Sequence, residues 1–278
     1  MSGIGIIGPG RAGVGLALAL TEAGHEVWLY GRRGKDVPPP LRLSWGGIPD
    51  WLSQVGVVIL AVRDGAIEPA ACELAGAAVL GDRQVVLHLS GMLGLEPLAA
   101  LRPTGAALGV LHPLQAIARP ESAPERLRGA LAVVTGDDRA MATAELLARD
   151  VGMRPVRLAA GSKPLYHAAA AIASNYLVVL AALTERLLID AGLPSNDARA
   201  GLVALMQGTL ENVRVEGPRA LTGPIVRGDV ETVAAHLAVL PPDVADVYRA
   251  LGLEALRATA LDPATVRRMR ELLKGGTA

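Results

Sequence analysis

The chain has 278 residues, which predicts about two domains, and its 51% hydrophobic content and mean hydropathy of +0.37 suffice for a substantial core. Its 27 basic and 27 acidic residues give a formal net charge of zero, which argues against a dedicated nucleic-acid or membrane-surface binder. The one cysteine, Cys72, excludes a disulfide framework, and we expect it to be a small buried hydrophobe in a reducing cytosol. No signal-peptide pattern is recognisable, so we expect a cytoplasmic protein.

The N-terminal segment predicts a strand, a glycine turn, a helix and a second strand. Apolar runs over residues 3–7 and 26–30 read as strands, and residues 14–23 carry apolar residues at helical spacing. The intervening glycines form G-x-G-x-x-G in the context that a dinucleotide-binding unit requires; they are Gly8, Gly10 and Gly13. The first would allow the tight turn, the second the approach of a pyrophosphate, and the third close helix–sheet packing. The pyrophosphate is expected on N–H groups at the helix N-terminus.

The end of the second predicted strand favours NADP over NAD. In NAD-selective folds a carboxylate at this position binds the adenosine ribose 2′-hydroxyl, whereas this strand ends in Tyr30-Gly31-Arg32-Arg33. Without that acid, Arg32 and Arg33 are free to clasp a 2′-phosphate. The alternative is that both arginines only begin a solvated loop.

Strands and helices continue to alternate up to residue 159. A short run follows at 41–44, and further strands are expected at 55–62, 84–89, 106–111, 130–135 and 154–158, with helices at 66–74, 95–101 and 139–151. This alternation predicts an α/β Rossmann doubly wound sheet with right-handed crossovers, over a first domain of residues 1–159. The expected cofactor-binding residues are Gly8, Pro9, Gly10, Arg11, Ala12, Gly13, Arg32, Arg33, Ala61, Val62, Arg63, Ser90 and Gly91.

Two motifs at strand ends, HLSG and LHPLQ, fall where an open α/β sheet binds its ligands. Ser90 and Gly91 are expected to border the nicotinamide, with Ser90 also available to the substrate. His88 lies inside its strand and is expected to be a core histidine. His112 is a candidate for binding a substrate carboxylate or shuttling a proton.

A third cluster, GSKPLYH, lies where the sheet domain passes to a helical domain of residues 160–278. Because proline suits the first position of a helix and disfavours helix before it, Lys163 is expected just outside a helix whose first turn contains His167. Both are candidate catalytic residues, for anion binding or as general acids. The structural alternatives are a solvated hinge lysine and a capped, buried histidine.

Beyond residue 159 the pattern predicts helices only. The longest spans about 164–190, and its apolar part, 168–183, is shorter than a membrane span and contains Asn175. We expect this helix to lie at the centre of the helical domain or at a subunit interface, with Asn175 bonded to substrate or to a neighbouring backbone. Further on, Thr222 and Arg227 are candidate substrate-binding residues, and Asp229 is expected to cap a helix. We predict no metal site.

The motifs GPGRAG, VILAVRDGAI, LHLSG, LHPLQ, YHAAAAIASNY and LTGPIVRGD together resemble a family that joins an N-terminal Rossmann-like NADP-binding domain to a C-terminal helical domain of unknown function. More distantly, the plan is similar to pyrroline-5-carboxylate reductase, ketopantoate reductase and 6-phosphogluconate dehydrogenase. The resemblance implies a helical domain of the 6-phosphogluconate dehydrogenase C-terminal type and a homodimer built through it. Those relatives place asparagine one turn after a catalytic lysine, whereas His167 stands there in this chain. His112-Pro113 is similar to the strand-end histidine of prephenate dehydrogenases, which implies a carboxylated substrate.

These observations predict an NADP-dependent oxidoreductase acting on a small carboxylated carbonyl, imine or hydroxy compound at an interdomain cleft. Lys163, His167 and His112 would supply proton transfer and carboxylate binding, while Asn175, Thr222 and Arg227 would orient the substrate. Two alternatives remain: a non-catalytic NADP-binding sensor of redox or nucleotide state, and a deazaflavin-linked NADP reductase.

Overall fold

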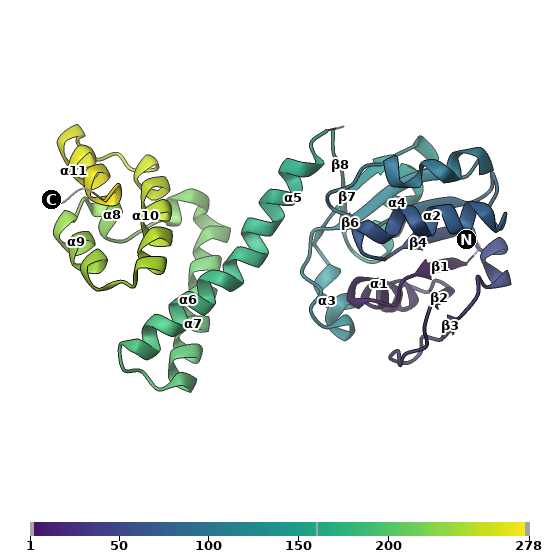
Figure 1. Ribbon diagram of the computed structural model, residues 1–278, viewed down its shortest axis with the longest axis horizontal. Coiled ribbons are helices and arrows are strands. Elements are labelled where there is room, and N and C mark those ends of the chain that lie inside the picture. The colour runs from purple at the N-terminus through teal and green to yellow at the C-terminus, as the bar shows by residue number, and fades with distance from the viewer. Residues whose placement is uncertain (1–2, 160, 276–278) are drawn as a thin grey trace. The chain divides into compact units, whose positions relative to one another are not determined.

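A computed structural model describes residues 3–159 and 161–275 of the chain (Figure 1). The chain divides into two compact units, with the boundary between Asn175 and Tyr176. The predicted boundary after residue 159 marks the end of the sheet, and the helix that follows belongs to the first unit.

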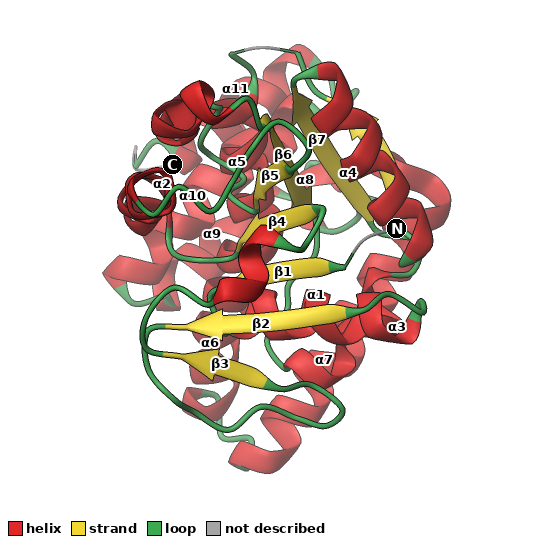
Figure 2. Cartoon of the chain, turned by 90° about the vertical axis from the view of Figure 1, so that its right-hand side faces the viewer, coloured by secondary structure: helices red, strands yellow, loops and turns green. Residues whose placement is uncertain are grey.

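The first unit contains an eight-stranded sheet in the order β3-β2-β1-β4-β5-β6-β7-β8 (Figure 2). The strands are β1 (Ile4–Ile7), β2 (Val27–Gly31), β3 (Leu43–Trp45), β4 (Val57–Leu60), β5 (Val85–His88), β6 (Ala107–Pro113), β7 (Leu131–Gly136) and β8 (Arg154–Arg157). The first six follow the order typical of dinucleotide-binding sheets, so the predicted Rossmann-like fold is confirmed.

One neighbouring pair, β6 and β7, is antiparallel, which the simple alternation of strands and helices did not predict. The segment between them starts and ends at the same edge of the sheet: Leu114, just after β6, donates its N–H to the carbonyl of Leu131 at 2.7 Å. Because this connection does not cross the sheet, β7 returns in the opposite direction. All the other neighbouring strands are parallel.

Both faces of the sheet are covered, which explains the nearly continuous apolar strands. Helices α1 (Arg11–Glu22), α3 (Ala123–Leu127) and α4 (Asp138–Asp150) contribute to one apolar layer with Ile4 and Ile6 of β1. Helix α2 (Ile67–Gly76) contributes to the other layer with Ile7. The alternation of side chains along β1 therefore places its residues in both layers.

Cys72 is exposed, so its predicted burial is wrong. Helix α2 buries Ile67, Ala71 and Leu74, which recur at the spacing of one helical face. Cys72 follows directly after Ala71 and therefore lies off that face.

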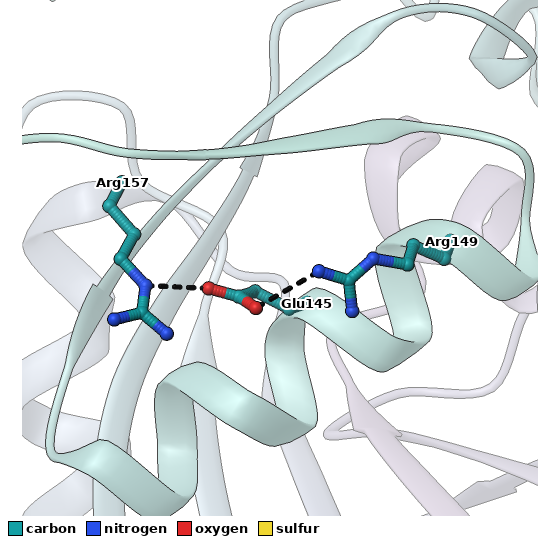
Figure 3. Close-up of polar contacts among 3 residues, drawn as sticks. All are labelled: Glu145, Arg149 and Arg157. Carbon is teal, nitrogen blue, oxygen red and sulfur yellow. Dashed lines mark hydrogen bonds and ion pairs between the residues drawn. The ribbon is translucent and has the colours of Figure 1, made fainter.

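The edge strand β8 is tied to α4 by charged side chains (Figure 3). Glu145 of α4 accepts hydrogen bonds from Arg157 Nε at 2.7 Å and from Arg149 Nη2 at 3.1 Å. The bond from Arg157 is the main reason why the pKa of Glu145 is lowered. Exposed ion pairs of this kind stabilise little, but arginines on β8 blunt an edge that could otherwise pair with another strand.

The long predicted helix at 164–190 is present as three consecutive segments. These are α5 (Lys163–Ala171), a π-helical turn (Ile172–Tyr176) and α6 (Leu177–Asp190). The expectation that its apolar part lies buried at the centre of the helical domain is wrong, because α6 contains no buried residue. By length and composition alone, the helical run Lys163–Asp190 could cross a membrane, because an 18-residue window within it has a mean hydropathy of 1.5.

The second unit is helical, and no described residue after Arg157 lies in a strand. After α6 it contains α7 (Ser195–Glu216), α8 (Pro224–Arg227), α9 (Val230–Val239), α10 (Pro242–Arg257) and α11 (Pro263–Leu273). A small core forms between α9, α10 and α11 around Val233, Leu256 and Met269. Asp229 caps α9 by accepting the N–H of Thr232 at 3.0 Å, as predicted.

Gly13 packs so closely against the glycine turn that a side chain does not fit. A Cβ placed on Gly13 would lie 2.1 Å from the carbonyl oxygen of Gly8, which is backbone and cannot turn aside. We expect Gly13→Ala to lower the free energy of unfolding by about 2 kcal/mol or more in chemical denaturation of the sheet unit.

The matched control for this variant is Gly76→Ala in α2. Apart from its chain neighbours and the backbone of its own helix, no described atom lies within 4 Å of a Cβ at Gly76, so this change is expected to be neutral or to stabilise by up to about 1 kcal/mol. Equal responses of the two variants would contradict the steric explanation.

Candidate active site

The glycine turn joins β1 to α1 beside the end of β4. Gly8 has a φ of 107°, and a Cβ there would lie 2.6 Å from the carbonyl oxygen of Ala61. Gly10 is the N-cap of α1, and beyond its own chain neighbours a Cβ there would approach only that carbonyl among the described atoms, at 4.0 Å. No described side chain caps α1. Open space over Gly10 and free N–H groups at a helix start are what a pyrophosphate requires.

A pocket of about 410 Å³ opens next to this turn, a size typical of small-molecule sites. Of the predicted cofactor residues, those lining it are Gly8, Pro9, Gly10, Arg32, Ala61, Val62 and Arg63. Arg11, Ala12 and Gly13 form the first turn of α1, and Arg33 is exposed on the loop after β2. Apolar walls come from Ile48, Ala70 and Leu74, which the motif did not identify.

Two charged residues at this pocket were missed by the sequence analysis. Lys35 donates to the carbonyl of Pro9 at 2.6 Å and so brings a cation to the glycine turn. Glu73 of α2 lines the pocket and accepts a hydrogen bond from Arg32 at 2.9 Å. Lys35 could have been predicted at this pocket, because it follows the two arginines closely in sequence. No motif around Glu73 indicates that its side chain lines the pocket.

A second group of polar residues gathers at the ends of β5 and β6. His88 is fully buried, as predicted. Its Nδ1 accepts the N–H of Ser90 at 3.1 Å, so its Nε2 must carry the proton that bonds to the carbonyl of Gly94 at 2.7 Å. Burial lowers the pKa of His88, the Gly94 bond opposes that shift, and the nearby charge of Lys163 lowers it further. His88 is therefore a neutral structural group.

Ser90 is 5% exposed, and its hydroxyl stabilises the turn after β5. The Oγ atom accepts the N–H groups of Met92 and Leu93 at 3.1 and 3.0 Å. The carbonyl of Ser90 accepts a hydrogen bond from Lys163 Nζ at 2.8 Å. The contact between Ser90 and the lysine is thus made through the backbone.

Lys163 is the first residue of α5, one position inside the helix rather than just outside it as expected. With 6% exposure it is not a solvated hinge residue. Burial lowers its pKa to about 8, and the negative charges of Asp64 and Glu96 oppose this shift. Its ammonium group has further donors beyond the one bonded to Ser90.

His112 at the end of β6 meets α5 one turn beyond Lys163. Its Nδ1 lies 2.7 Å from Tyr166 Oη, and its ring stands edge-on to the rings of Tyr166 and His167. Burial, then the charge of Lys163, lowers the pKa of His112 to about 4, while burial raises that of Tyr166 to about 12. Both partners are therefore neutral near pH 7.

Gly91 lies between the two imidazoles. A Cβ on Gly91 would lie 2.8 Å from both His112 Nε2 and His167 Nδ1. His167 is exposed, so the alternative of a buried histidine is wrong. Tyr166 is the residue that the sequence analysis overlooked here, although it stands in the same motif.

The remaining predicted residues are Asn175, Thr222 and Arg227. Asn175 is exposed in the π-helical turn at the end of the first unit. Thr222 and Arg227 belong to the second unit, where both are exposed. No group of three metal-ligating side chains occurs in the described part of the chain.

The fold and its glycine turn define a Rossmann-type architecture followed by helices. Residues 130–255 match the model of a family described as a domain of unknown function, DUF2520. The resemblance inferred from the motifs is thereby confirmed: a chain with a Rossmann-like sheet matches a family of unknown function over its C-terminal region. No curated protein sequence matches the chain.

Several solved structures share this fold. A suggested NADP oxidoreductase of Bacteroides fragilis is similar over 92% of this chain and 98% of its own, with 19% identity and a TM-score of 0.73. A Thermotoga maritima protein is similar over 98% of both chains, with 23% identity and a TM-score of 0.63. Pyrroline carboxylate reductase of Plasmodium falciparum, solved with NADP bound, is similar over 98% of both chains, with 11% identity and a TM-score of 0.61. At these identities the similarity establishes the fold.

The buried environment of Lys163 yields a titration that can be measured. Its pKa of about 8 lies below the usual 10.5, so the folded protein releases this proton earlier than the unfolded chain does. Below about pH 8 the charged Lys163 therefore lowers the free energy of unfolding. This destabilisation decreases as the pH rises from about 8 toward 10.5. NMR of ¹³C-labelled lysine should show one signal titrating near pH 8 that Lys163→Met removes, whereas Lys274→Met, at an exposed position, retains it. Titration of every lysine signal above pH 10 would contradict this assignment.

Proposed function

We propose that the chain is an NADP-dependent oxidoreductase acting on a small carboxylated carbonyl, imine or hydroxy compound. The observation that carries the proposal is the convergence of Lys163 and the His112–Tyr166 pair on the ends of β5 and β6. This is the edge of an open α/β sheet where ligands bind, and the glycine turn lies at the end of β1 in the same sheet.

The nucleotide is assigned from the residues around the glycine turn. The uncapped start of α1 suits the pyrophosphate, and Arg32, Arg33 and Lys35 supply positive charge for a 2′-phosphate. A fold shared with a reductase solved with NADP is consistent with this assignment. When bound, the nicotinamide supplies the hydride, and the remaining chemistry is left to the protein.

Lys163 is proposed as the general acid and anion-binding group. The carbonyl of Ser90 fixes its ammonium, and the remaining N–H donors are available to a substrate carboxylate, carbonyl oxygen or imine nitrogen. Its pKa of about 8 suits proton donation near neutral pH, where the cation still predominates. In the reducing direction this proton passes to the substrate atom that the hydride leaves negatively charged.

His112 is proposed to orient the substrate as a neutral hydrogen-bonding group. With a pKa of about 4 it carries no charge near pH 7, and its contact with Tyr166 holds the ring so that Nε2 faces Gly91 and His167. When the phenol donates to Nδ1, Nε2 bears a proton and binds a substrate oxygen. His167, exposed on the other side of Gly91, is proposed as a second such group.

The first test is calorimetry of NADPH and NADH with the whole chain, followed by a panel of keto acids and imines with the preferred nucleotide. Lys163→Met and Tyr166→Phe are expected to lower kcat/KM by about 10² to 10⁴-fold, with nucleotide affinity nearly unchanged. In the wild type, kcat/KM for reduction should fall as the pH rises through about 8, because Lys163 then loses its proton.

Lys274→Met is the control, since it removes an exposed lysine of the second unit. Full turnover by Lys163→Met would exclude its proposed role. Tight NADPH binding without turnover of any substrate would instead favour the sensor. Hydride transfer to a deazaflavin would favour the deazaflavin-linked reductase.

We also propose that the chain forms a homodimer through its helical unit. Helices α6 and α7 pack together and leave large apolar side chains exposed, such as Val178, Leu205 and Val215 at 68%, 69% and 67%. An apolar surface of this kind marks an interface, and the family resemblance implies a second copy.

Sedimentation should therefore give a dimer that Val178→Glu or Leu205→Glu converts to a monomer. Val239→Glu is the control, because it places the same charge on α9, at a residue that is 80% exposed. A wild-type monomer, or a chain that floats with lipid vesicles, would contradict the dimer.

A further inference from the structure

The pocket beside the glycine turn contains a carboxylate, that of Glu73, whereas the end of β2 has none. Glu73 lies on α2, and its Oε2 accepts a hydrogen bond from Arg32 Nη2 at 2.9 Å. Both side chains line the same pocket as the glycine turn. An acid is therefore present at the place where the sequence of β2 indicates none.

The negative charge of Glu73 reaches the inner wall of this pocket. Tyr30 is 4% exposed at the end of β2, and its hydroxyl donates to the carbonyl of Gly46 at 2.7 Å. Burial raises the pKa of Tyr30, and the charge of Glu73 raises it further, against the opposing effect of Arg32. Glu73 and Arg32 thus act on the same small volume with opposite signs.

We propose that Glu73 moderates the preference of this site for 2′-phosphorylated nucleotides by competing with the ribose 2′-phosphate for Arg32. The inference rests on the proposed nucleotide-binding function. A 2′-phosphorylated dinucleotide must displace the carboxylate from Arg32 and then lie beside it. A dinucleotide with a free 2′-hydroxyl leaves the ion pair in place and can donate a hydrogen bond to the carboxylate.

The ion pair can be opened at small cost. The side chains of Arg32 and Glu73 are 70% and 43% exposed, so water screens their attraction. The wild-type site is therefore expected to prefer the phosphorylated nucleotide, because Arg33 and Lys35 add positive charge nearby. Glu73 makes this preference smaller than it would be if Arg32 had no carboxylate partner. The carboxylate moderates the preference without abolishing binding.

The experiment compares the binding of NADPH and NADH by calorimetry in the full chain, with 2′,5′-ADP and 5′-AMP as probes of the adenosine end alone. Glu73→Gln should raise the ratio of NADPH to NADH affinity by about fivefold, and the probes should follow the same trend. The effect should be smaller when Arg32→Gln is already present, because there is then no arginine to release.

Glu68→Gln is the matched control, since it removes the same charge from an exposed position on α2 outside the pocket. It should leave the affinity ratio unchanged. Glu73→Ala serves as a second variant, to separate loss of charge from an effect of the new amide.

An unchanged or lower ratio in Glu73→Gln, with both nucleotides still bound, would overturn this inference and leave the proposed function intact. A lower ratio would mean that Glu73 orients Arg32 for the phosphate. If the wild type binds neither nucleotide, the proposed function and this inference fail together.

Discussion

The hydrogen bond from the Lys163 ammonium to the carbonyl of Ser90 joins the first helix after the sheet to the end of β5. Burying a charge is costly unless it is bonded, and the lowered pKa of Lys163 reflects that cost. The carbonyl and the charges of Asp64 and Glu96 offset part of it. The contact also fixes where α5 starts, and Tyr166 and His167 follow one turn later, where they meet His112 and Gly91.

Local hydrogen bonds hold the turn after β5 in place, so that the Ser90 carbonyl can accept the hydrogen bond from Lys163. Neutral His88 accepts the N–H of Ser90, and the Ser90 hydroxyl accepts two further N–H groups of the turn. These local bonds orient the Ser90 carbonyl before any ligand binds. A lysine held in this way keeps its remaining donors directed without paying side-chain entropy on binding, which is the basis of a preorganised site.

The features that could be predicted from the sequence are those that depend on residues close to one another in the chain. Gly8 is required by its positive φ within the turn and Gly13 by its approach to the Gly8 carbonyl, and the strands are recognisable because parallel strands covered on both faces are continuously apolar. Lys163 and His112 could be selected because a proline and a strand end mark their positions. Tyr166 could not be selected from the sequence, because only its contact with His112 marks it as part of the site, and His112 lies 54 residues earlier in the chain. The partner of Arg32 is likewise 41 residues away on α2.

Burial of the long helix was misjudged for a related reason: an all-round apolar composition does not say whether a helix is covered. The π-helical turn at Ile172–Tyr176 adds a residue to one helical turn, so the faces of α5 and α6 need not follow one continuous stripe. On α5, Lys163, Tyr166 and His167 are spaced by three and four residues and share one face, which contacts the ends of β5 and β6. One side of the turn thus supplies polar groups to the candidate site, while α6 remains free to present apolar residues.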